Sequence, residues 1–108
     1  MAKFKEGQYI AAVRQKKFME DLQDGKYVIA KIIRIAPSSV GGEGNFYYQA
    51  QSEDGNVYMA FERNINQGLY EFIEISELVR YLERFGNEKL SDGYYLIDKA
   101  NKVRQEYL

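Results

Sequence analysis

Paired carboxylates are the residues of this chain whose types and spacing come closest to catalytic or metal-binding chemistry. They are Glu20/Asp21, Glu53/Asp54 and Glu71/Glu74. Two carboxylates flanking a cleft can act as acid and base, and a spaced set can hold calcium. None of these pairs has the spacing of a calcium loop, and no motif places two of them beside a recognisable cleft.

The 108-residue chain has no Cys and no His. Their absence excludes a disulfide, a thiolate nucleophile, a Cys/His zinc site and a histidine general base. Tyr and Lys can also act as bases, but no signature supports that use here. We therefore expect a protein that is not an enzyme and that needs neither a metal nor another cofactor.

A glycine-rich stretch invites comparison with a phosphate-binding loop. It consists of Gly41, Gly42, Glu43 and Gly44. A phosphate loop needs a following Gly-Lys-Ser/Thr sequence and a helix N-terminus, whereas this stretch leads into an aromatic run. We expect instead a flexible connection, or a loop that becomes ordered on a partner.

An aromatic hairpin over residues 45–63 is the clearest local signal, because Asp54-Gly55 separates two alternating runs. A turn centred on this pair predicts that Ser52 faces Val57 and that Tyr48 faces Phe61. A four-residue loop gives the same pairs.

This register predicts two different hairpin faces, because side chains alternate along a strand. A core face would carry Tyr48, Ala50, Val57, Met59 and Phe61. A presenting face would carry Tyr47, Gln49, Gln51, Tyr58, Ala60 and Glu62. Its Tyr and Gln residues are typical of a binding surface, or of a half-exposed sheet whose cross-strand pairs only stabilise the hairpin.

Basic residues interleaved with aromatic ones suggest a second use of the same region. Lys31 and Arg34 could contact phosphates while Tyr47 and Tyr58 stack on bases, as in single-strand binders. Simple alternation predicts that Lys31 and Arg34 lie on opposite faces of their strand. The net charge of −1 and the lack of a dense basic patch argue against a nucleic-acid partner.

The flanking elements follow from apolar periodicity. Residues 8–23 predict a helix, with a strand over 8–14 as the alternative. Residues 26–36 predict a central strand covered on both faces. Residues 69–75 could be a strand or an irregular approach to a helix. Further expected elements are a helix over 76–86, a strand over 93–97 and a weakly packed helix over 99–107.

The helix over 76–86 is expected to begin at an N-cap, Ser76, and to pack on the core face of the hairpin through Leu78, Leu82 and Phe85. Asp98 is expected to cap the last helix. Acid–Gly pairs, such as Asp54-Gly55, predict turns in which the acid caps and Gly takes a positive φ.

These elements predict one α+β domain over residues 1–108. We expect a three- to five-stranded, mainly antiparallel sheet with two or three helices, and an OB-like, partly open barrel is compatible with it. Charge is uneven: residues 1–36 carry eight Lys/Arg against four Asp/Glu, and residues 37–93 carry four against ten. Such asymmetry favours oriented contact with a charged partner.

We expect a small binding module, an adaptor or inhibitor that contacts another protein through Tyr47, Gln49, Gln51, Tyr58 and the glycine-rich loop. A single-stranded nucleic-acid binder is the alternative, and a homo-oligomer built through a sheet edge is a third. No membrane partner is expected, because the longest apolar stretches fall far short of the ~20 residues that a spanning helix needs. The N-terminus lacks the apolar region of a signal peptide, so a cytoplasmic location is expected.

Overall fold

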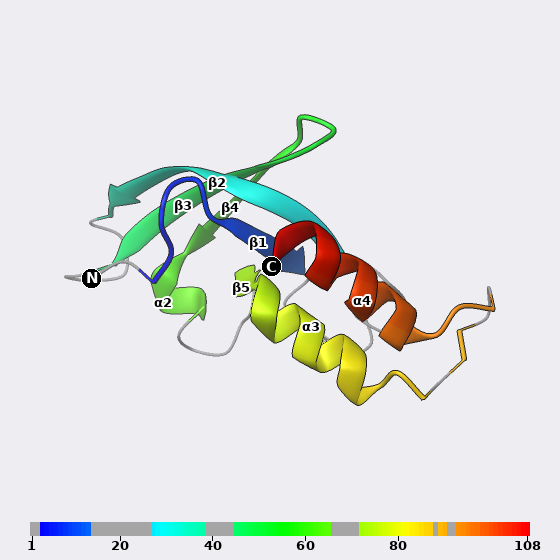
Figure 1. The fold of residues 1–108 in the computed structure, drawn as a ribbon. Coiled ribbons are helices and arrows are strands. Elements are labelled where there is room, and N and C mark those ends of the chain that lie inside the picture. Colours follow the sequence, from blue (N-terminus) through cyan, green and yellow to red (C-terminus); the bar gives the residue numbers. More distant parts are fainter. Residues whose placement is uncertain (1–2, 14–26, 39–44, 66–71, 88, 91–92) are drawn as a thin grey trace.

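The computed structural model describes residues 3–13, 27–38, 45–65, 72–87, 89–90 and 93–108 (Figure 1). Its strands are β1 (Tyr9–Val13), β2 (Tyr27–Pro37), β3 (Phe46–Ser52), β4 (Val57–Phe61) and β5 (Phe72–Glu74). Its helices are α2 (Glu62–Asn64), α3 (Ile75–Arg84) and α4 (Leu96–Tyr107).

The strands form one five-stranded antiparallel sheet in the order β4-β3-β2-β1-β5. The first four strands follow one another as a meander, and β5 returns to pair with β1. The sheet curves into a half-barrel, and α3 and α4 pack on it. The predicted α+β class with a partly open barrel is thereby confirmed.

Residues 9–13 form β1, so the helix expected over 8–23 is wrong there and the alternative strand is right. Ile10, Ala11, Ala12 and Val13 are all buried. A run that is apolar on both faces suits a strand covered on both sides, and it carries no helical period. Residues 14–23 lie outside the described residues.

The sheet is buried on both faces, by two separate apolar clusters. The α2-side core contains Phe4, Ile10, Ala12, Ala30, Ile32, Tyr48, Ala50, Ala60, Ile65 and Phe72. The helix-side core contains Ala11, Val13, Ile73, Ile75, Leu78, Val79, Leu82, Leu96, Ala100 and Val103. The central position predicted for β2 is confirmed, but the helices that the structure describes cover its first half alone, where Tyr27 and Ile29 contact the helix-side core.

Helix α3 buries the predicted stripe, with Leu78, Val79 and Leu82 inside and Phe85 half-buried. It packs over β1 and β5, however, and not on the hairpin as expected. Ser76 is not its N-cap: Glu74 occupies that position without a side-chain cap bond. The helix begins one residue before Ser76 because Ile75, buried at 4% exposure, continues the buried stripe towards β5.

Helix α4 begins at Leu96, so the strand expected over 93–97 is wrong, and only an isolated bridge joins Lys89 to Tyr95. Asp98 lies in the first turn and is not the cap. Helix α4 packs inward through Ala100, Val103 and Tyr107, because all of them join or contact the helix-side core. The buried Leu96 adds a fourth.

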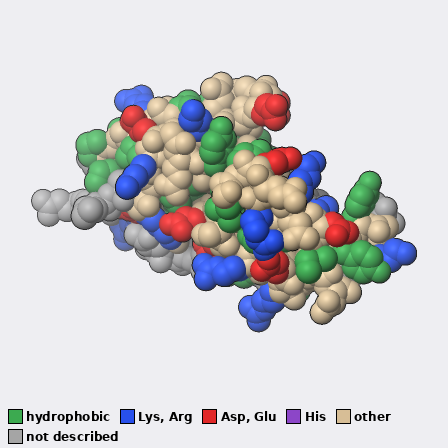
Figure 2. Space-filling view, viewed as in Figure 1, with side chains coloured by type: hydrophobic (Ala, Val, Ile, Leu, Met, Phe, Trp, Pro, Cys, Tyr) green, Lys and Arg blue, Asp and Glu red, His purple; other side chains and the backbone are tan. Residues whose placement is uncertain are grey.

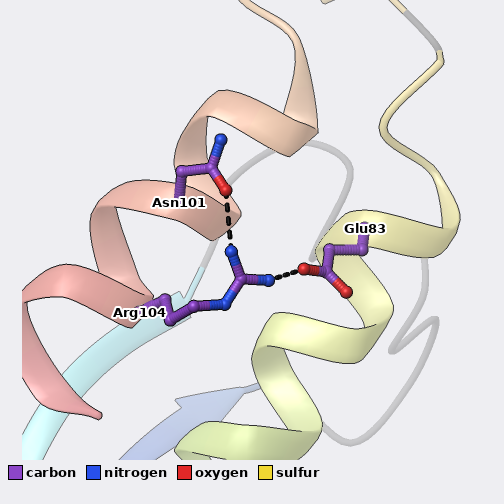
Figure 3. Close-up of polar contacts among 3 residues, drawn as sticks. All are labelled: Glu83, Asn101 and Arg104. Atoms are coloured by element: carbon purple, nitrogen blue, oxygen red, sulfur yellow. Dashed lines mark hydrogen bonds and ion pairs between the residues drawn. The ribbon is translucent and has the colours of Figure 1, made fainter.

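An ion pair connects α3 with α4, and the backbone just after α3 lies close to the first turn of α4. Arg104 forms an ion pair with Glu83 and donates a hydrogen bond to Asn101 at 2.8 Å (Figure 3). Both ends of the pair are about 40% exposed (43% and 40%), so it contributes at most about 1 kcal/mol. At Gly86 an added Cβ would lie 2.8 Å from Cβ of Ile97, so this position has no room for a side chain.

Truncating Leu82 tests the helix-side core. Leu82 is fully buried in that cluster, so Leu82→Ala is expected to lower the free energy of unfolding by about 2–5 kcal/mol in urea titration. The matched control is Leu108→Ala, at a residue that is 66% exposed, and it should change the stability by less than about 0.5 kcal/mol. Equal stabilities of the two variants would contradict this packing.

Candidate binding face

The turn between β3 and β4 has a three-residue loop, Glu53–Gly55. The amide of Gly55 donates to the carbonyl of Ser52 at 3.0 Å, and the amide of Ser52 donates to the carbonyl of Asn56 at 2.9 Å. Gly55 has a φ of +91°, as the third position of such a loop requires. The Ser52 hydroxyl and the Asn56 amide both donate to Asp54, and these bonds hold the pKa of its carboxyl below the usual value.

This loop shifts the hairpin register by one residue from the predicted one. Tyr47 pairs with Phe61, Gln49 with Met59, and Gln51 with Val57. A two- or four-residue loop gives the pairs that the sequence predicted. A three-residue loop shifts the second strand by one residue, so each of its side chains lies on the face opposite to the predicted one.

The register corrects six assignments on β4 and just beyond it. Val57, Met59 and Phe61 were expected in the core but lie on the opposite face, where Val57 and Met59 are 48% and 59% exposed. Tyr58 and Ala60 were expected on the presenting face but contact or join the α2-side core. Glu62, also expected there, is buried. Tyr58 is therefore not part of one surface with Tyr47.

A β-bulge in β2 corrects the predicted placement of Lys31 and Arg34 on opposite faces. Lys31 pairs with Gln51 and Arg34 pairs with Gln49, so Ile33 is the extra residue between two pairs on the same face. The bulge places Arg34 beside Lys31, although alternation predicted opposite faces. Ile33 itself is 45% exposed.

We call the resulting surface the open face. It consists of Lys31, Ile33, Arg34, Tyr47, Gln49, Gln51, Val57, Met59 and Phe61. Each of these side chains is exposed or half-buried, because the described helices cover the sheet over β1, β5 and the start of β2. The sheet thus brings together five of the sequence-predicted contacts: Tyr47, Gln49, Gln51, Lys31 and Arg34.

Contacts within the open face hold its aromatic side chains in place. The rings of Tyr47 and Phe61 have centroids 5.4 Å apart, and the Tyr47 hydroxyl donates to the sulfur of Met59. The amide of Gln49 donates to the Tyr47 hydroxyl at 3.1 Å. The face carries two cations and no carboxylate, although the whole chain has a net charge of −1.

The reverse side of the hairpin contains a buried polar cluster. Tyr48 donates to Oε1 of Glu62 at 2.8 Å, and the backbone amide of Lys3 donates to both Tyr48 and Glu62. Phe4 packs edge-on against the Tyr48 ring, with centroids 5.2 Å apart. The cluster is buried, and its hydrogen bonds join the N-terminal segment to the hairpin.

Several members of the open face were missed as contacts because the predicted register placed them in the core. They are Val57, Met59 and Phe61; Ile33 was missed because nothing in the sequence marks the bulge. The signal that could have found the first three is the order Ser-Glu-Asp-Gly-Asn, in which Gly stands third in the loop. Gly41, Gly42, Glu43 and Gly44 lie outside the described residues.

Two other described regions of the surface carry exposed aromatic residues or a hollow. Figure 2 shows hydrophobic side chains at the end of the molecule formed by the α3–α4 connection, where Tyr94 and Tyr95 are 61% and 43% exposed. A hollow of about 290 Å³ lies between β2 and α4; its lining includes Tyr27, Lys99 and Glu106. Within the described ranges, no three acidic, His or Cys side chains gather as metal ligands.

The Tyr48 cluster predicts a stability that falls at high pH. Burial, and then the hydrogen bond to Glu62, raise the pKa of Tyr48 from 10.0 to about 12. The folded protein therefore keeps this proton in a pH range where the unfolded chain has lost it. This contribution is complete below about pH 10 and disappears as the pH rises through about 12.

Urea unfolding of the wild type and of Tyr48→Phe across this range measures the effect. The free energy of unfolding should fall more steeply with pH in the wild type, because the variant lacks the titrating phenol. Parallel profiles would contradict the assignment.

None of the described helices is both long and apolar enough to cross a membrane. No protein-family model matches this chain, and neither a curated protein nor a solved structure matches it.

Proposed function

We propose that this chain is a non-enzymatic binding module, an adaptor or inhibitor, that contacts another protein through the open face. The observation that carries the proposal is a sheet face that the described helices leave uncovered, with Ile33, Val57 and Met59 each 45% or more exposed. Exposed apolar residues that form a contiguous patch commonly mark an interaction site.

The composition of the open face supports a protein partner. Tyr, Phe, Met and Arg are enriched in interfaces, and Tyr47, Phe61, Met59 and Arg34 supply one of each. Lys31 and Arg34, on a face whose named residues include no carboxylate, favour a partner that is acidic where it docks. A standard interface takes about 20–30 residues from each side, so this face would form its centre and neighbouring residues its rim.

The local contacts of the open face reduce the cost of binding. Tyr47 is held by Phe61, Met59 and Gln49, so little side-chain freedom remains to be lost when a partner docks. The two cores beneath and beside the sheet keep the strand backbones fixed. Such preorganisation is typical of a surface that binds as a rigid unit.

Charge reversal at Arg34 tests the protein-binding function. Immobilised wild type and Arg34→Glu are compared for the proteins they capture from a lysate, and captured proteins are then titrated individually. A partner of the open face should bind Arg34→Glu about 30-fold more weakly or worse, the effect of a 2 kcal/mol hot spot.

The matched control is Lys102→Glu, which makes the same charge change at an exposed position of α4 outside the open face. It should retain the partner. If every captured protein binds Arg34→Glu as well as it binds the wild type, the open face is not the binding surface.

A single-stranded nucleic acid is the second candidate partner, and the bulge in β2 is the observation that favours it. The bulge places Lys31 and Arg34 on the same face as the Tyr47–Phe61 ring pair. Cations for phosphates and rings for bases are the two components of single-strand binding. Tyr58, expected as a second stacking residue, lies on the reverse side and does not take part.

Fluorescence anisotropy with a labelled single-stranded oligonucleotide tests this candidate. Two phosphate contacts predict that log Kobs falls with log[salt] with a slope of roughly −1.4. Arg34→Glu should reduce the affinity and the slope, whereas Lys102→Glu should leave both near the wild-type values. Absence of binding at low salt would eliminate the nucleic-acid candidate.

A further inference from the structure

We propose that β4 pairs with the β4 of a second copy of this chain, antiparallel and with the two-fold axis at Met59. The two sheets would then join edge to edge. This proposal concerns the backbone edge of β4, although its side chains Val57, Met59 and Phe61 also belong to the open face.

Strand β4 lies at the edge of the sheet, and no described residue pairs with its outer side. Exposed edges are usually protected by charged residues, Pro, a bulge or short length. The β4 sequence Val-Tyr-Met-Ala-Phe contains neither a charged residue nor Pro, and its pairing with β3 has no bulge. The opposite edge, β5, has only three residues and leads directly into α3.

The turn determines which backbone groups β4 offers. Because Ser52 and Asn56 form the closing hydrogen-bonded pair, the alternating antiparallel pattern directs the backbone of Tyr58 and Ala60 towards β3. The N–H and C=O groups of Val57, Met59 and Phe61 consequently point to the open edge.

The side chains of β4 fit a second copy when Met59 faces Met59 of that copy. Val57 then faces Phe61, and Tyr58 faces Ala60, so a larger side chain meets a smaller one in these pairs. All three outward-directed backbone positions, Val57, Met59 and Phe61, become hydrogen-bonded. Met59, 59% exposed in the single chain, then lies beside Met59 of the second copy at the centre. A two-fold interface must be self-complementary in this way.

The charges at the two ends of β4 are complementary in the same arrangement. The turn before β4 carries Glu53 and Asp54, and its local hydrogen bonds lower the pKa of Asp54, which favours the charged form. Arg63, which is exposed, follows the other end of β4. Antiparallel pairing brings the acidic turn of each copy towards Arg63 of the other, while β4 itself contributes no charge.

Cysteine crosslinking tests the pairing and its register, since the chain has no Cys of its own. A hydrogen-bonded antiparallel pair has its Cα atoms about 5.5 Å apart, within disulfide range. Met59→Cys should therefore become a covalent dimer under mild oxidation, as seen by non-reducing electrophoresis.

The matched control is Val57→Cys, at a residue of similar exposure on the same strand and face. In the proposed register the two copies of this position lie roughly 13 Å apart, too far to bridge. This variant should stay monomeric under the same conditions. Equal crosslinking of the two variants, or preferential crosslinking of Val57→Cys, would overturn the proposal.

Sedimentation equilibrium tests the association without a crosslink. The average mass of the wild type should rise from 12.6 kDa towards twice that value as concentration increases. Met59→Lys places like charges at the axis and should stay at the monomer mass. Leu108→Lys, which adds the same charge at a residue 66% exposed beyond α4 and outside the sheet, should associate as the wild type does. A wild type that is monomeric at every concentration would overturn the proposal.

Discussion

The three-residue turn at Glu53–Gly55 determines which side chains this molecule shows to its surroundings. Its two backbone hydrogen bonds and the positive φ of Gly55 fix the register in which β4 pairs with β3. With that register, Tyr58 and Ala60 complete one core while Val57, Met59 and Phe61 remain outside. A shift of one residue would bury Met59 and expose Tyr58, so both a core and a surface depend on one loop length.

The same sheet serves as a scaffold and as a surface because its two faces are covered unequally. Helices α3 and α4 occupy one face over β1, β5 and the start of β2, and the α2-side core fills the other. What remains is the second half of β2 with β3 and β4. The bulge at Ile33 then collects both cations of β2 there. The open face is thus a consequence of where the helices end, and its charge is a consequence of one extra residue.

The sequence predicted those features that a long periodic pattern specifies. The hairpin follows from alternation and the buried stripe of α3 from apolar residues three and four apart, and the strand β2 follows from a long run that is apolar on both faces. Strand β1 was ambiguous because Tyr-Ile-Ala-Ala-Val has no period of its own. Tyr47, Gln49 and Gln51 were correctly grouped because they share one strand, whereas Tyr58 was misplaced because its face depends on the loop. The bulge has no sequence marker, and the pairing of β1 with β5 joins segments far apart in the chain.

The pairing of β1 with β5 has a consequence for how the chain reaches this structure. Ile10 pairs with Glu74 and Ala12 with Phe72, so these contacts have to close a long loop, whereas the β3–β4 hairpin closes a short one. During synthesis β1 emerges before β5, and it lacks this partner until residues 72–74 have followed it. The time for which this apolar strand is open to wrong neighbours is therefore governed by translation speed over the middle of the chain.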